Sequence, residues 1–213
     1  MHNYLKRGIS LFLCLAMVFA LSACSGSTLT EANITKTVEL VEKALRDFDK
    51  ETLQKYVNSK TLDYIIKFAG SKEQFDTIGK LLFEKLELNV KSVDLDNSTV
   101  TLEVLNLDMH LVGERYAKVI QVRSHGKATE MLSLLSDDDF LDLSVRSLTA
   151  QISQATVPDN PTEVTVRVQT SGKNLVLVLD EAAEDAVSGG VLTAVTNVFS
   201  PTDDSEEETT AAN

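Results

Sequence analysis

The stretch Val164–Leu179, VTVRVQTSGKNLVLVL, decides the fold class of this chain. Its first six residues alternate between apolar and polar side chains, which is typical of a strand with one buried face. Ser171-Gly172 supplies turn residues, and Asn174–Leu179 returns as a second strand. Because Leu175 to Leu179 are all apolar, this second strand is expected to be covered on both faces and central in its sheet. The stretch therefore predicts a β-hairpin.

Another hairpin is predicted closer to the N-terminus. Apolar residues alternate with polar ones over residues 86–91 and again over 100–104, with turn-forming residues at 94–98. Helical spacing surrounds both hairpins, over residues 30–48, 49–57, 61–69, 71–82, 110–155 and 181–199. The predicted fold class is therefore α+β. We expect an antiparallel sheet of about four strands, packed on N-terminal and C-terminal helices, with a helical insertion between the two hairpins.

Two of the helical segments carry more specific expectations. Val112, Tyr116, Val119 and Ile120 are spaced to form one buried stripe. Gly189-Gly190 lies inside the last helical segment, where each glycine costs about 1 kcal/mol relative to alanine. Either close packing against the sheet or a break in the helix would explain the pair.

The N-terminus has the pattern of an export signal. Lys6 and Arg7 precede a thirteen-residue apolar run, Ile9–Leu21, which is too short to be a permanent membrane span. The run ends in Leu21-Ser22-Ala23-Cys24, which resembles the bacterial lipoprotein processing box. The resemblance implies that the Cys24 sulfur receives a diacylglyceryl group and that the peptide is cut just before it. An uncleaved N-terminal anchor and an ordinary secretory signal are the alternatives.

This pattern divides the chain into four parts. Residues 1–23 form the predicted lipoprotein signal peptide, and residues 24–29 form the lipid anchor and a tether, of which Ser25–Leu29 spans at most about 17 Å. Residues 30–200 form a single α+β domain. Residues 201–213 form a tail with five acidic residues, which is predicted to be disordered. The expected location is the cell membrane, on its extracytoplasmic face.

The charge of the chain excludes one class of partner. The whole sequence has a net charge of −12, and the predicted leader removes two of its 20 Lys and Arg and none of its 32 Asp and Glu. The mature chain therefore carries about −14 and repels phosphate backbones and anionic head groups. Nucleic acid is not expected as a partner. Membrane attachment is expected to come from the diacylglyceryl group on Cys24, because two acyl chains are enough for stable anchoring.

Cysteine and histidine usage leaves little room for metal or nucleophile chemistry. Cys14 lies in the leader and Cys24 is predicted to be lipidated, so no thiol remains for a disulfide, a nucleophile or a metal. His110 and His125 are fifteen residues apart and lack the spacing of a zinc motif. They are expected to be surface residues or caps. No metal site and no cofactor is predicted.

Three short patterns are better explained by local structure than by chemistry. Asp94–Ser98 begins like a calcium loop, but Thr99 and Leu105 occupy the positions of the required Gly and Glu, so a hairpin turn is expected. Asp137-Asp138-Asp139 is typical of a helix start. Ser124-His125-Gly126-Lys127 matches the Ser-x-x-Lys pattern of serine acyl enzymes but lacks both companion motifs. No catalytic residue is predicted from these patterns.

The order of helices, hairpin, inserted helices, hairpin and helix resembles a known family. It looks like the lipoproteins of Gram-positive bacteria that carry a nuclear transport factor 2-like (cystatin-like) domain of unknown function. The residues that carry the resemblance are the helix Ile34–Phe48, the strands Val90–Val93 and Val100–Val104, and the segments Asn106–Met109 and Gly189–Val191. The resemblance implies a curved sheet wrapped on a long helix, which together form a cone with a pocket. It implies no catalytic residues.

Such a pocket can host an acidic general base when burial raises the pKa of a carboxyl group. Asp108 and Asp180, each at the end of a predicted strand, are the residues to inspect for this role, although strand-end aspartates are far more often turn formers.

The sequence therefore supports two hypotheses for the function. The first is a membrane-anchored, non-catalytic domain that binds an envelope protein or a small molecule. The alternative is a pocket enzyme of the hydrolase or isomerase type. The cavity discriminates between them: acids or histidines that converge on an open apolar pocket favour an enzyme, and a filled interior of Leu and Val favours a binding domain.

Overall fold

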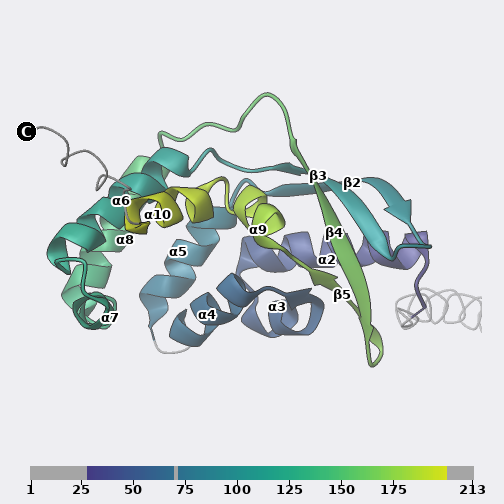
Figure 1. Ribbon diagram of the computed structural model, residues 1–213, viewed down its shortest axis with the longest axis horizontal. Helices are drawn as coiled ribbons and strands as arrows, with labels where there is room; N and C mark the ends of the chain where they lie inside the picture. Colours follow the sequence, from purple (N-terminus) through teal and green to yellow (C-terminus); the bar gives the residue numbers. More distant parts are fainter. Residues whose placement is uncertain (1–27, 70–71, 201–213) are drawn as a thin grey trace, which may run out of the picture.

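The computed structural model describes residues 28–69 and 72–200 of the chain (Figure 1). The predictions for the leader, for Cys24 and for the acidic tail 201–213 lie outside these described residues. The elements before the first hairpin are α2 (Glu31–Asp47), α3 (Lys50–Tyr56), the two-residue strand β1 (Val57–Asn58), α4 (Lys60–Ala69) and α5 (Glu73–Phe83). Helix α6 (His110–Arg123) follows the hairpin. The first hairpin itself comprises β2 (Glu87–Asp94) and β3 (Thr99–Leu105).

The remaining elements follow the predicted order. After α6 come α7 (Ala128–Leu134), α8 (Asp138–Ile152), the hairpin β4 (Thr162–Ser171) and β5 (Asn174–Val178), and finally α9 (Glu181–Val187) and α10 (Val191–Phe199). The α+β class is confirmed. Among the described residues, no helix has the length and apolar character needed to cross a membrane.

The sheet differs from the prediction in composition and direction. Its five strands are ordered β1-β5-β4-β3-β2, and β1 runs parallel to β5, with Val57 opposite Leu177 and Asn58 opposite Val178. The four expected strands form and pair antiparallel, but β1 adds a fifth strand in parallel, so the sheet is mixed and not purely antiparallel as predicted. Two extended residues between two helices produce no periodic signal, so β1 is invisible in the sequence.

The position of β5 was also predicted incorrectly. Strand β4 is central in the order of the described strands, while β5, like β3, is second from the edge and has only the two-residue β1 on its outer side. Burial alternates along β5, with Leu175 and Leu177 buried and Val176 and Val178 half-buried. Its continuous apolar run therefore reflects a partly covered outer face and not a central position.

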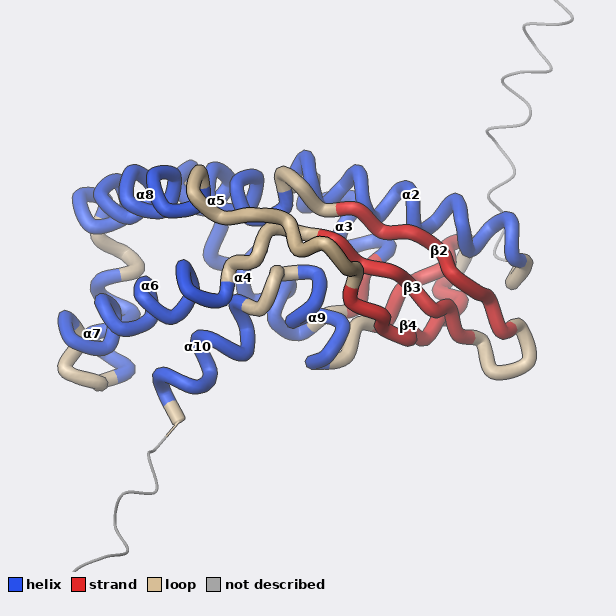
Figure 2. The backbone as a smooth tube through the Cα atoms, turned by 90° about the horizontal axis from the view of Figure 1, so that it is seen from above, coloured by secondary structure: helices blue, strands red, loops and turns tan. Residues whose placement is uncertain are grey.

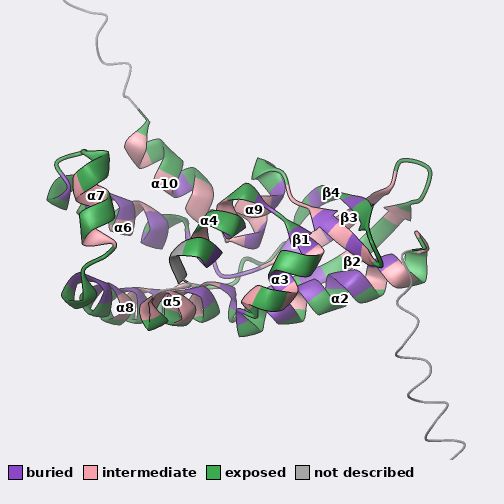
Figure 3. Cartoon of the chain, turned by 90° about the horizontal axis from the view of Figure 1, so that it is seen from below, coloured by how far each residue is buried: buried purple, intermediate pink, exposed green. Residues whose placement is uncertain are grey.

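The main core lies between α2 and the sheet. Thr30 caps α2 by accepting a hydrogen bond from the Asn33 N–H, and the apolar face of the helix, Ile34, Val38, Val41 and Leu45, is at most 1% exposed. This face packs with the inward residues of all four long strands and with Leu53 and Leu86. Figure 3 shows this buried seam running between α2 and the strands.

Helix α2 ends in a close contact that fixes α5. Phe48 adopts the left-handed conformation (φ 50°, ψ 44°), and its backbone N–H bonds the last turn of α2. Its buried ring lies against Gly79, where a Cβ atom would be 2.4 Å from the ring. Only glycine leaves room for the ring at this helix crossing.

A second, smaller core joins the helices at the other end of the molecule. Leu107, Met109, Val112, Leu148 and Ile152 are buried together, with Ile78, Leu81 and Val191 packed against them. Buried Asn106 connects the two cores, because its side-chain amide donates to Leu82 O (3.0 Å) and Val187 O (2.8 Å), and its Oδ1 accepts from Leu107 N (2.8 Å).

The last helical segment is broken at the predicted glycine pair. Gly189 (φ 66°) and Gly190 (φ 86°) both adopt positive φ, so α9 stays on the sheet while α10 turns away to pack along α6 (Figure 2). Gly189 also lies against the segment that enters α6: its carbonyl accepts from Met109 N (2.8 Å), and a Cβ atom would be 2.0 Å from Leu107 O. A break in the helix and a close approach thus both explain the pair.

Candidate functional site

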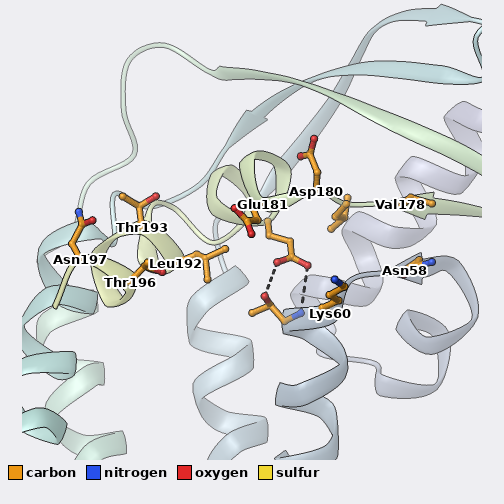
Figure 4. A pocket seen from close by; sticks show the side chains of 12 residues that line it. Asn58, Lys60, Val178, Asp180, Glu181, Leu192, Thr193, Thr196 and Asn197 are labelled. Carbon is orange, nitrogen blue, oxygen red and sulfur yellow. Dashed lines mark hydrogen bonds between the residues drawn. The ribbon is translucent and has the colours of Figure 1, made fainter. Parts of the chain in front are cut away.

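Two hollows flank α9 and form the candidate site. The first, of about 580 Å³, lies between the start of α4, the end of β5 and the two last helices (Figure 4). The second, of about 540 Å³, lies between α9, the segment that links β3 to α6, and residues 158–162. Glu181 and Thr193 line both hollows. The break at Gly189-Gly190 shapes the site, because it sets the angle between the helices that form its walls.

Glu184 closes the floor of the first hollow. Its carboxylate accepts hydrogen bonds from the Ser59 hydroxyl, from the Thr61 hydroxyl (2.5 Å) and from the Thr61 N–H (3.4 Å). Ser59 is buried, and its hydroxyl oxygen in turn accepts from Leu62 N (3.0 Å). Glu184 therefore supports the start of α4, from a position 125 residues away along the chain.

Three further carboxylates cap helices around α9. Asp180 accepts from Ala183 N (2.9 Å) at the start of α9, and Asp185 accepts from Thr193 N (2.7 Å) at the start of α10. Asp108 accepts from His110 N (3.1 Å) at the start of α6. These three aspartates thus bind backbone N–H groups that helix starts leave unpaired.

The remaining lining groups are suited to hydrogen bonding. Thr193, Thr196 and Asn197 on α10 and Asn58 at the end of β1 contribute hydroxyl and amide groups to the first hollow (Figure 4). Among the described residues that line this hollow, Lys60 is the one cation, against Asp180, Glu181 and Glu184. The second hollow is lined by Asp108, Glu181 and Asp185 without a Lys or Arg. Both hollows therefore favour a neutral or cationic ligand.

The structure separates the two candidate general bases. Asp180 lines the first hollow and Asp108 lines the second, so the two do not meet in one pocket. Each uses a carboxylate oxygen to cap a helix. This arrangement agrees with the simpler interpretation of strand-end aspartates as turn and cap residues.

The histidines and the acidic runs also have local partners. His125 forms a hydrogen bond with Glu130 (2.8 Å). The hydrogen bond from Lys127 lowers the pKa of the Glu130 carboxyl most, and the hydrogen bond with His125 lowers it further. His110 begins α6, and the described residues contain no group of three His, Cys, Asp or Glu side chains placed to hold a metal ion. Asp137 caps α8 by accepting from Phe140 N (2.7 Å), which confirms the capping prediction.

The two remaining patterns are turns and helix ends. Asp94 accepts from Asn97 N (3.0 Å) and from the Asn97 amide (2.7 Å), and these hydrogen bonds lower the pKa of Asp94. The hairpin-turn prediction for residues 94–98 is confirmed. Ser124 is fully buried and its hydroxyl lies 3.4 Å from Gln121 O, while Lys127 pairs with Glu130 (2.9 Å). The Ser-x-x-Lys pattern therefore forms the end of α6.

Several residues that build the site were not predicted from the sequence, among them Ser59, Glu184 and Asp185. Ser59 carries a signal, since a serine just before a helical segment is a good N-cap. Glu184 and Asp185 carry none, because their partners are 123 and 8 residues away in the chain and depend on tertiary structure. A comparison with protein-family models, curated proteins and solved structures finds no match.

Proposed function

We propose that this protein is a lipid-anchored, extracytoplasmic lipoprotein with a non-catalytic binding domain at the cell envelope. The observation that carries the proposal is Leu21-Ser22-Ala23-Cys24 at the end of a short apolar run. Cys24 carries the diacylglyceryl anchor, and the domain that follows binds an envelope protein or a small molecule. The hollow beside α9 and α10 is the proposed ligand site.

The packing of the interior supports a binding domain over an enzyme. The resemblance implies a pocket in the cone that the long helix and the curved sheet form together. Here that space holds side chains that are at most 1% exposed, among them Ile34, Leu45, Leu102 and Leu177. The hollows instead lie outside the main core, and three of their acids, Asp108, Asp180 and Asp185, are engaged as helix caps. Because the interior is filled, it supports a domain that binds its partner or ligand at the surface over an enzyme with an internal pocket.

The nuclear transport factor 2-like architecture is part of the same proposal. The helical insertion between two hairpins and the packing of α2 under the sheet support it. The parallel pairing of β1 with β5 is a departure from the antiparallel sheet expected of that family.

Lipidation is tested by mass spectrometry of the protein isolated from membranes of its native host. We expect an N-terminal peptide that begins at Cys24 and carries the diacylglyceryl mass. The Cys24→Ser variant should lose the modification and leave the membrane fraction, whereas Ser25→Ala should keep both. An unmodified thiol, or a leader still attached, would overturn the assignment.

Ligand binding is tested by titrating the domain with metabolite pools and envelope extracts while following backbone amide resonances. Shifts confined to residues around α9 and α10 support the site. Turnover of a defined substrate that is lost in Asp108→Asn or Asp180→Asn, with the fold retained, would instead establish the enzyme hypothesis.

A further inference from the structure

The outward face of α6 differs in charge from the rest of the molecule. Residues 110–127 contain Arg115, Lys118, Arg123 and Lys127 but a single acid, Glu114, so this segment has a net charge of +3 in a chain of −12. The composition of the whole chain hides this local excess. The net charge of the whole chain therefore does not describe this segment.

Apolar side chains are interleaved with two of these cations, Arg115 and Lys118, on one face of α6. Leu111, Val119 and Val122 are 51%, 45% and 73% exposed. At 3.6 residues per turn, these three residues fall with Arg115 and Lys118 within about 100° of the helix circumference. The opposite side of α6 carries the buried residues Gly113, Ala117 and Ile120, and buried Val112 borders the exposed face. Sequence analysis placed Val119 on the buried stripe, and that prediction was wrong because α10 covers the side that bears Gly113.

The cations of this face are available to a partner. Among the described residues Arg115 makes no ion pair, and Lys118 pairs with Glu114 of its own helix. Such exposed pairs contribute little to stability and are readily exchanged. An exposed helix face that combines Arg and Lys with Leu and Val has the chemistry of a helix lying at a membrane interface.

The face lies at the far end of the domain from the start of α2. Figures 1 and 2 both place α6 and α2 toward opposite ends of the long axis. A domain tethered near α2 and held also at α6 would lie along a bilayer and not stand upright on it.

We propose that the face formed by Leu111, Arg115, Lys118, Val119 and Val122 contacts the anionic phospholipid head groups of the membrane to which the protein is anchored. This inference rests on the proposed function, because the anchor keeps the face close to the bilayer and raises its effective concentration there. The negative charge elsewhere does not prevent the contact, since charges farther away than a Debye length of about 8 Å are largely screened at physiological salt.

The first test uses the unlipidated chain from residue 24 with Cys24→Ser, so that its outcome is independent of the anchor. Sedimentation with vesicles of phosphatidylcholine alone, and of phosphatidylcholine with an equal amount of phosphatidylglycerol, measures the partition coefficient. We expect binding only with the anionic lipid, and weaker binding at higher salt. Each cation near an anionic surface contributes about fivefold, so Arg115→Gln/Lys118→Gln should weaken binding roughly 25-fold.

Two comparisons make the test specific to this face. Lys43→Gln/Arg46→Gln removes the same charge from exposed positions on α2 and should change binding less than about twofold. Val119→Ser/Val122→Ser keeps the charge and should also weaken binding, since the apolar groups no longer enter the interface. Circular dichroism checks that each variant is folded.

The second test uses the lipidated protein in the anionic vesicles, with an environment-sensitive fluorophore on Glu114→Cys or, as a control, Asp96→Cys. We expect a blue shift at position 114 alone. Equal binding to neutral vesicles, an equal loss in the α2 control, or no shift at position 114 would overturn the inference. Binding to polyglutamate but not to vesicles would also overturn it and assign the face to an acidic protein. An unmodified Cys24 in a protein whose α6 face still binds vesicles would refute the anchor alone.

Discussion

Replacing Gly189 by alanine should destabilise the domain strongly. The φ angle of 66° places this residue in the left-handed region, which costs a residue with a Cβ about 1–2 kcal/mol. The new Cβ would also lie 2.0 Å from Leu107 O, so the backbone must move and the Met109 N to Gly189 O hydrogen bond (2.8 Å) must lengthen or break. That hydrogen bond contributes about 1 kcal/mol, and the shift disturbs the smaller core around Met109. We expect a loss of about 3–5 kcal/mol in the free energy of unfolding.

Gly190→Ala is the matched control for this prediction. Gly190 also has positive φ (86°), but a Cβ there would meet nothing closer than 3.5 Å from His110. The control should therefore show only the backbone penalty of about 1–2 kcal/mol. The difference between neighbouring glycines isolates the close approach to Leu107.

Urea unfolding followed by far-ultraviolet circular dichroism measures both variants, because the chain contains no tryptophan for fluorescence. For a domain of this size, a loss of 3–5 kcal/mol corresponds to a decrease in Tm of roughly 6–20 °C. Equal destabilisation by the two substitutions would refute the claim that Gly189 is required for the contact between the helix break and the segment that enters α6.

Three other outcomes test the packing. Asn106→Ala should cost about 2–4 kcal/mol, because it leaves buried carbonyl groups without donors, whereas exposed Asn160→Ala should be nearly neutral; urea unfolding compares them. Gly79→Ala should destabilise the domain less in a Phe48→Leu background, since the smaller side chain frees the space that a Cβ needs; an additive double-mutant cycle would contradict this contact. Burial raises the pKa of the Tyr116 phenol, because the charged phenolate is disfavoured in the interior. The stability that the neutral buried phenol provides is therefore complete below pH about 10 and is lost as the pH rises through the folded-state pKa. Tyr116→Phe should reduce this alkaline loss in pH-dependent unfolding.

The local elements of this protein could be predicted from short stretches of its sequence. Alternation identified both hairpins, and the run Asp137-Asp138-Asp139 identified the start of α8, because the Asp137 carboxylate bonds the N–H of Phe140 three residues ahead. The proposed location at the membrane also comes from the sequence, since Leu21–Cys24 is a contiguous motif. These features depend on neighbours in the chain and therefore leave a local pattern.

Tertiary structure alone decided what joins distant parts of the chain. The parallel pairing of β1, the support of α4 by Glu184 and the exposure of Val119 each depend on which element packs beside which. An apolar residue on a helix gives the same periodic signal whether α10 covers its side or leaves it in solvent. The site beside α9 and the cationic face of α6 therefore became visible only when the helices were placed.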